Sequence, residues 1–150
     1  LYEYFDSKED ILWTLAKEGD SRLRRAALNI RPELPSTERL IQACLAYVDF
    51  SVHNAEYFII INSLTTHRAS LEEPASSESS YSVFLKIIEA AIDEGEIISR
   101  DNFCAEEITY SLWALIHGMG MLRLTQLRNF NADFESINRK AIETFIIGLK

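Results

Sequence analysis

Two segments near the end of the chain, about 105–127 and 133–149, carry apolar residues on two faces of a predicted helix. The stripes of the first segment are Ile108, Leu112, Leu115, Met119 and Leu122, and Trp113, Ile116, Gly120, Leu124 and Leu127. Those of the second are Phe134, Ile137, Ala141, Phe145 and Gly148, and Ile142, Ile146 and Leu149. A helix that is apolar on two faces is buried on two sides. In a domain of this size we expect the second side to pack against another subunit; the alternative is a central core helix of a monomer.

The rest of the chain shows helical periodicity as well, in segments near 8–30, 36–52, 55–66 and 80–94. Ser7 with Asp10 forms a pattern that resembles a capping box, Pro32 stops the first segment, and Gly95 can end the fourth. The apolar run 57–61 has strand propensity, but its helical neighbours favour a buried helix. Residues 67–80 are Ser-rich and polar, which predicts a loop. With only 5 Gly and 3 Pro in 150 residues, the sequence predicts an all-α fold of about six helices.

Charge and chemistry exclude several classes of protein. The net charge of −8 disfavours nucleic-acid binding by this chain alone, because phosphate neutralisation requires a basic surface. The apolar runs are too short to span a membrane, and no signal peptide is present, so we expect a cytoplasmic protein. Cys44 and Cys104 lie in apolar helical contexts, which favours packed free thiols over a disulfide. We expect no metal site, no cofactor and no enzymatic activity, because metal-ligand spacings, phosphate loops and nucleophile motifs are absent.

The first eleven residues, Leu1-Tyr2-Glu3-Tyr4-Phe5-Asp6-Ser7-Lys8-Glu9-Asp10-Ile11, resemble the stretch that closes the helix-turn-helix in TetR-family repressors. The resemblance implies that residues 1–6 are a remnant of the recognition helix and its turn, and that 7–150 form the ligand-binding and dimerisation domain. Tyr2, Tyr4 and Lys8 are then expected near DNA phosphates. The helices upstream are expected to be missing, so we predict operator DNA as a partner only of the intact protein.

A second motif, Leu112-Trp113-Ala114-Leu115-Ile116-His117-Gly118, is similar to the Trp-His-Gly signature of one subgroup of TetR C-terminal domains. In that family the last two helices pair with those of a second subunit as a four-helix bundle. The resemblance therefore implies a homodimer, in agreement with the two-sided stripes. We predict that its interface contains Leu115, Met119, Leu122, Phe134, Ile137, Ala141 and Phe145.

The resemblance also implies a pocket for a small-molecule effector, whose identity the sequence leaves open. An apolar pocket with few polar groups is the usual small-molecule site. We predict as its lining Tyr47, Phe50, Phe58, Phe84, Trp113, His117 and Met121. The alternatives are that these aromatic residues are plain core and that His117 is a core histidine satisfied by a neighbour. Gly118 and Gly120 weaken a helix, which points either to close helix packing, the alternative we favour, or to room for a ligand.

These inferences predict an effector-responsive transcriptional regulator that acts as a repressor, with this chain as its sensing and dimerisation domain. The effector would bind two conformations unequally, and the helix after Ser7 would transmit the shift to the DNA-binding unit. The alternative is a helical dimerisation or adaptor module with no ligand of its own.

Overall fold

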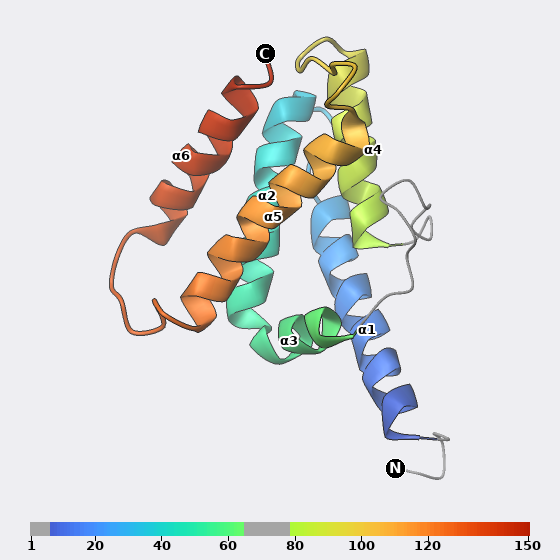
Figure 1. Ribbon diagram of the computed structural model, residues 1–150, viewed down its shortest axis with the longest axis vertical. Helices are drawn as coiled ribbons and strands as arrows, with labels where there is room; N and C mark the ends of the chain where they lie inside the picture. The colour runs from blue at the N-terminus through green and yellow to red at the C-terminus, as the bar shows by residue number, and fades with distance from the viewer. Residues whose placement is uncertain (1–6, 65–78) are drawn as a thin grey trace.

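The computed structural model describes residues 7–64 and 79–150, and over those ranges the chain forms six helices and no strand. The helices are α1 (Lys8–Leu28), α2 (Ser36–His53), α3 (Ala55–Ser63), α4 (Ser80–Asp93), α5 (Ala105–Leu124) and α6 (Phe134–Ile147). Figure 1 shows them in chain order. The predicted all-α fold with six helices is confirmed, and the run 57–61 is helical.

The helix starts follow the predicted capping residues. The Ser7 hydroxyl accepts a hydrogen bond from the Asp10 backbone N–H at 3.2 Å, and Asp133 caps α6 in the same way through the N–H of Ser136. Gly95 follows α4 with a φ of +73°, a left-handed conformation that glycine adopts without steric penalty. These local hydrogen bonds satisfy backbone donors that would otherwise be unpaired at each helix start.

Several helices end earlier than the sequence predicts, including the first, which ends at Leu28 instead of residue 30. The third helix ends at Ser63 instead of Thr66, and the fifth ends at Leu124 instead of Leu127. The sixth ends at Ile147 instead of Leu149. In the fifth, Thr125 leaves the helical region, with φ −118° and ψ −98°, although the apolar pattern continues beyond it. The apolar pattern depends only on the side chains in the sequence. It therefore cannot show where the backbone leaves the helical conformation.

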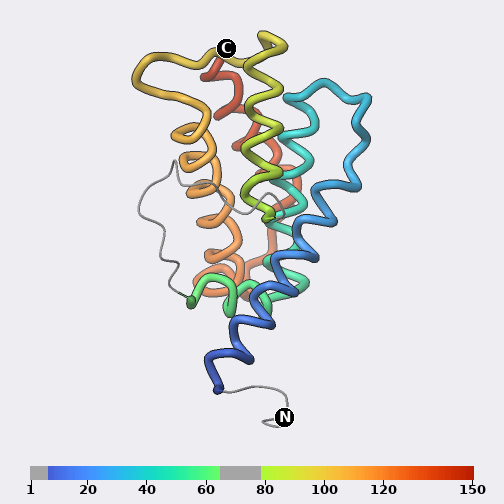
Figure 2. Tube along the Cα trace, turned by 90° about the vertical axis from the view of Figure 1, so that its right-hand side faces the viewer, coloured from blue at the N-terminus to red at the C-terminus, as the bar shows by residue number. Residues whose placement is uncertain are grey.

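Helix α2 is the centre of the bundle and packs against all five other helices. Three of its side chains, Leu40, Ala43 and Cys44, are completely buried. In Figure 1 α5 crosses in front of α2 and α6 lies beside it, while Figure 2 shows α1 and α4 rising together on another side of the bundle. The N-terminal end of α1 projects past α3, beyond the remaining helices (Figure 1).

Two of the helix crossings require glycine. A Cβ atom at Gly120 of α5 would lie 2.5 Å from the Ser51 Oγ and 2.9 Å from its Cβ, on α2. One at Gly19 of α1 would lie 3.1 Å from the Tyr57 Cβ on α3. The predicted close packing at Gly120 is therefore confirmed. Gly118 differs, because a Cβ there would point into open space.

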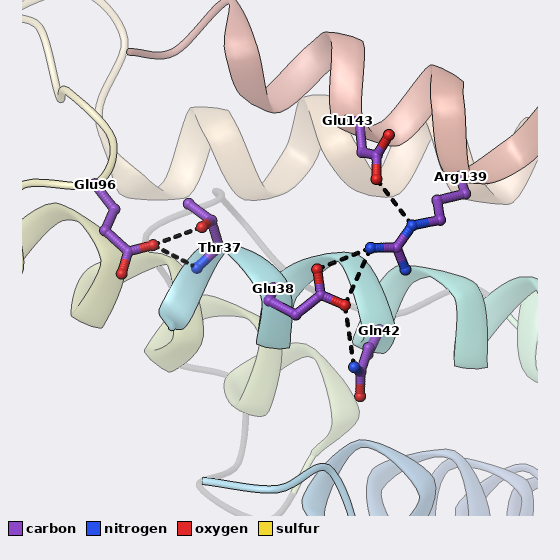
Figure 3. Close-up of polar contacts among 6 residues, drawn as sticks. All are labelled: Thr37, Glu38, Gln42, Glu96, Arg139 and Glu143. Atoms are coloured by element: carbon purple, nitrogen blue, oxygen red, sulfur yellow. Dashed lines mark hydrogen bonds and ion pairs between the residues drawn. The ribbon is translucent and has the colours of Figure 1, made fainter. Parts of the chain in front are cut away.

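The start of α2 is held by two acidic side chains from the segment that follows α4, of which Figure 3 shows Glu96. The Ser36 hydroxyl donates to Glu94 at 2.6 Å, and the backbone N–H and hydroxyl of Thr37 donate to Glu96 at 2.9 and 2.6 Å. The hydrogen bonds from Thr37 lower the pKa of Glu96. Negative charge at a helix N-terminus is favourable, so these contacts fix the α4–α5 connection to the central helix.

An ion pair joins α6 to α2. The Arg139 guanidinium donates to Glu38 on α2 at 2.9 Å and to Glu143 on its own helix at 2.8 Å (Figure 3). Burial alone would raise the pKa of Glu38, but hydrogen bonds from Gln42 and Arg139 outweigh it and the pKa is lowered. The pair fixes the orientation of α6 on the bundle, and with it the direction of the outer face of α6.

Candidate functional site

Five of the seven predicted ligand residues lie together in the interior, although they come from four helices. They are Tyr47 on α2, Phe58 on α3, Phe84 on α4, and Trp113 and His117 on α5, and we refer to them as the aromatic cluster. The Tyr47 ring meets Phe58 and Phe84 edge to face, with centroid distances of 5.8 and 6.4 Å. Phe58 lies 5.3 Å from the His117 ring. Such contacts add to the burial energy of the rings.

A chain of hydrogen bonds runs through the cluster. The Trp113 indole donates to the Tyr47 hydroxyl oxygen at 3.1 Å, and that oxygen lies 3.1 Å from the Nδ1 of His117. An indole N–H can only donate, so the Tyr47 oxygen is the acceptor and its own proton is available to Nδ1. The arrangement is satisfied when His117 is neutral and carries its proton on Nε2.

Burial determines the ionisation of these groups. It raises the pKa of Tyr47 to about 12, against a smaller opposing effect of the hydrogen bond from Trp113. It also lowers the pKa of His117. Near neutral pH, both side chains are therefore uncharged donors or acceptors, which suits recognition of a neutral polar group inside an apolar site.

The cluster reaches the surface at the indole. Trp113 is 41% exposed, and its ring packs edge to face with that of Tyr81 on α4 at 6.2 Å. The hydrogen-bonded chain therefore leads from a partly exposed donor to the buried rings of Tyr47 and Phe58. Tyr81 is one of the aromatic residues that the sequence offers for a pocket, but it is not among the seven predicted lining residues.

The other two predicted ligand residues make no aromatic contact or side-chain hydrogen bond with the cluster among the described residues. Phe50 is buried on α2 and belongs to the same hydrophobic core as Tyr47, Phe58 and Phe84. Met121 on α5 is 37% exposed, close to the 41% of Trp113.

A hollow among the described residues lies between α2, α5 and α6. It has a volume of about 380 Å³, and its polar lining consists of Asp49, His53, Arg123, Glu135 and Asn138. No residue of the aromatic cluster lines it, or a smaller pocket between α1, α2 and α4. The sequence analysis missed both hollows, because their residues come from three helices and share no pattern along the chain.

The residues of the predicted dimer interface lie on α5 and α6, and three of them, Leu115, Met119 and Phe145, also pack against the core of the chain. Leu122 and Ile137 are exposed, at 46% and 53%, while Leu115, Met119, Phe134, Ala141 and Phe145 are partly buried. Gly118 also lies on α5, and no described residue lies within 4 Å of the position of a Cβ there. We call this surface, defined by Gly118 and these seven residues, the outer face.

The residues predicted to contact DNA phosphates are only partly covered by the structure. Lys8 is the first residue of α1 and is exposed. Tyr2 and Tyr4 lie outside the described residues. Across 7–64 and 79–150, no group of three or more His, Cys, Asp or Glu side chains is arranged to hold a metal ion. Over the same ranges, each helix is too short or too polar to cross a membrane.

Comparison with known proteins identifies the fold. No family model and no curated protein matches the chain. A protein with unknown function from Rhodococcus sp. RHA1 has a similar structure, with 23% identity, a TM-score of 0.78, and coverage of 97% of this chain and 76% of that one. A bacterial regulatory protein in the TetR family from Rhodococcus RHA1 is similar over 99% of this chain and 77% of its own, with 18% identity and a TM-score of 0.72. The chain therefore has a TetR-like fold.

Proposed function

We propose that this chain is the effector-sensing and dimerisation domain of a transcriptional regulator that acts as a repressor. The observation that carries the proposal is the fold, which is shared over 99% of the chain with a TetR-family regulatory protein. Two motifs support it independently of the fold. They are the opening segment 1–11 and the Trp113–Gly118 motif on α5.

The aromatic cluster is the proposed effector site. An effector with an apolar body would pack against Phe58 and Phe84, and its polar group would exchange hydrogen bonds with the Trp113–Tyr47–His117 chain. These groups already satisfy one another, so a ligand must replace a bond between them with one of its own. The site therefore selects ligands that present both a donor and an acceptor.

The signal would reach α1 through α3. Phe58 of the cluster is on α3, and α3 packs on α1 at the close crossing where Gly19 meets Tyr57. Packed helices at this separation move together and do not deform independently, so a displacement of Phe58 by ligand would shift α1. The N-terminal end of α1 projects from the bundle past α3, and the DNA-binding unit is proposed to attach at this end of the chain (Figure 1).

Dimerisation is proposed to use the outer face of α5 and α6. Glycine inside a helix is less favourable than alanine by about 1 kcal/mol, and no contact with residues 7–64 or 79–150 explains its presence at position 118. Close approach of a second copy would explain it. Operator DNA would be bound only by the intact dimer, in which Tyr2, Tyr4 and Lys8 lie near phosphates. The net charge of −8 disfavours DNA binding by this domain alone.

A ligand screen by thermal shift, followed by operator binding, tests the proposal. Compounds that raise the melting temperature should lose most of that effect in Tyr47→Phe, which removes the hydroxyl between Trp113 and His117. Tyr110→Phe is the matched control, because Tyr110 is exposed on α5 and outside the cluster. In the intact regulator, the same compounds should weaken operator affinity. Stabilisation that is equal in both variants would place the effector elsewhere, and unchanged operator affinity would refute the regulatory role.

A helical adaptor without a ligand is the second candidate, and one observation favours it. The rings of the cluster pack against each other, and none of them lines the hollow between α2, α5 and α6 or the pocket between α1, α2 and α4. The same screen discriminates between the two candidates. An adaptor gives no stabilising compound that depends on the Tyr47 hydroxyl, yet it still forms the dimer.

A further inference from the structure

A small pocket between α1, α2 and α4 has an unusual lining for an acidic protein. Its volume is about 180 Å³ and it is lined by Arg24, Leu28, Arg39, Val83, Lys86 and Ile87. Half of these side chains are cationic and half are aliphatic. The three cations come from three different helices, in a chain with 23 acidic and 15 basic residues.

The three cations are not neutralised by the surrounding chain. Among the described residues, no carboxylate lies within ion-pairing distance of Arg24, Arg39 or Lys86, and their side chains make no hydrogen bond. The Nε of Arg24 is buried without an acceptor. A buried donor without a partner loses its hydration and gains nothing in return. Like charges gathered around one hollow also repel each other, and a bound anion would relieve both penalties.

The lining indicates the chemistry of the anion. Guanidinium groups bind carboxylates and phosphates through paired N–H donors, and an ammonium adds a point charge. Leu28, Val83 and Ile87 offer apolar surface beside these charges, which a bare inorganic anion would not use. We propose that this pocket binds a small organic carboxylate whose short aliphatic or aromatic group packs on the three aliphatic side chains.

This site is separate from the proposed effector site, because none of its six lining residues belongs to the aromatic cluster. Carboxylate binding therefore does not depend on the proposed function. Its position has a structural consequence, since α1, α2 and α4 pack against one another here. Figure 2 shows α1 and α4 on the same side of the bundle. A bound carboxylate would join these helices and restrain α1.

Isothermal titration with benzoate and hexanoate tests the site, with benzamide and inorganic phosphate as comparison probes. Both carboxylates should bind saturably, more tightly than phosphate, and benzamide should not bind. Arg24→Gln and Arg39→Gln should each weaken benzoate binding at least about tenfold, as expected for the loss of a charge-assisted hydrogen bond. Arg25→Gln is the matched control, because this exposed neighbour of Arg24 on α1 lies outside the pocket. It should change the affinity less than about twofold.

Other results would overturn the proposal. An equal loss of benzoate affinity in the Arg25→Gln and Arg24→Gln variants would show a general charge effect. Equal affinities for benzoate and phosphate would show that the aliphatic residues play no part. Absence of saturable binding up to the solubility limit of benzoate would remove the site altogether. Urea unfolding of each variant separates loss of binding from loss of folding. If Arg24→Gln does not fold, Arg39→Gln still tests the site.

Discussion

The two glycines of α5 provide a paired test of how this helix is packed. Gly118 and Gly120 are two residues apart in the same helix, so alanine at either position gains about 1 kcal/mol of helix propensity. Their surroundings differ. A Cβ at Gly118 meets nothing within 4 Å, whereas one at Gly120 lies 2.5 Å from the Ser51 Oγ. Ser51 is completely buried and donates to the Val48 carbonyl at 2.6 Å, which limits its ability to move away.

The propensity gain cancels when the two variants are compared, so their difference isolates the packing penalty. Overpacking of a well-packed interior typically costs about 1–3 kcal/mol. Within the monomer, Gly118→Ala should be more stable than the wild type by about 1 kcal/mol. Gly120→Ala should be less stable than Gly118→Ala by about 1–3 kcal/mol. Urea unfolding monitored by circular dichroism, at concentrations low enough to populate the monomer, measures both differences.

Equal stability of the two variants would refute the close crossing of α2 and α5. The same pair also tests the outer face. If a second copy approaches Gly118, the added methyl group weakens self-association even though it stabilises the monomer. Gly118→Ala with an unchanged dimer dissociation constant would show that no close subunit contact lies there.

Two further predictions concern polar groups. His117 has a lowered pKa, so as the pH falls below about 6.5 the unfolded chain takes up this proton first, and the wild type loses stability towards pH 5. In His117→Gln, urea titrations should show a smaller loss of unfolding free energy as the pH falls below about 6.5. The control His53→Gln, at an exposed position, should show the same loss as the wild type. Arg139→Met removes the partner of Glu38 and should cost about 0.5–1 kcal/mol at neutral pH, because the pair is partly exposed. The pKa of Glu38 is lowered, so this difference is present above pH 4.5 and disappears as the pH falls through the folded pKa; a constant difference down to pH 2 would contradict it.

The sequence was sufficient for the elements of the fold, because caps and breakers act locally. Ser7, Pro32 and Gly95 mark helix ends through short-range hydrogen bonds and backbone limits. The apolar run 57–61 was ambiguous between strand and helix by itself. Its helical neighbours indicated the helix correctly, but the expectation that this helix is buried was wrong. Phe58 is its only buried residue, and Ile59 is 56% exposed.

The candidate site was less predictable, because it depends on the depth and rotation of each helix. Tyr47, Trp113 and His117 meet across α2 and α5, whereas Phe50, three residues after Tyr47 on α2, makes no ring contact with another described residue. Apolar character alone cannot separate these positions. Similarly, nothing in the sequence distinguishes the cations of the smaller pocket from other basic residues that are expected at the surface. Only the packing of α1, α2 and α4 brings them to one hollow.

We propose that the outer face of α5 and α6 joins two copies of this chain. The molecular mass of the protein in solution is a direct test of this dimer. Sedimentation equilibrium at micromolar concentration should give twice the chain mass of 17.2 kDa for the wild type. Ile137→Glu should give the monomer, because it places a charge in the proposed interface. Ile59→Glu is the control, because Ile59 on α3 is similarly exposed, at 56% against 53%, and should leave the dimer intact. A monomeric wild type would contradict dimerisation, and a dimer that persists in Ile137→Glu would show that the interface is not the outer face.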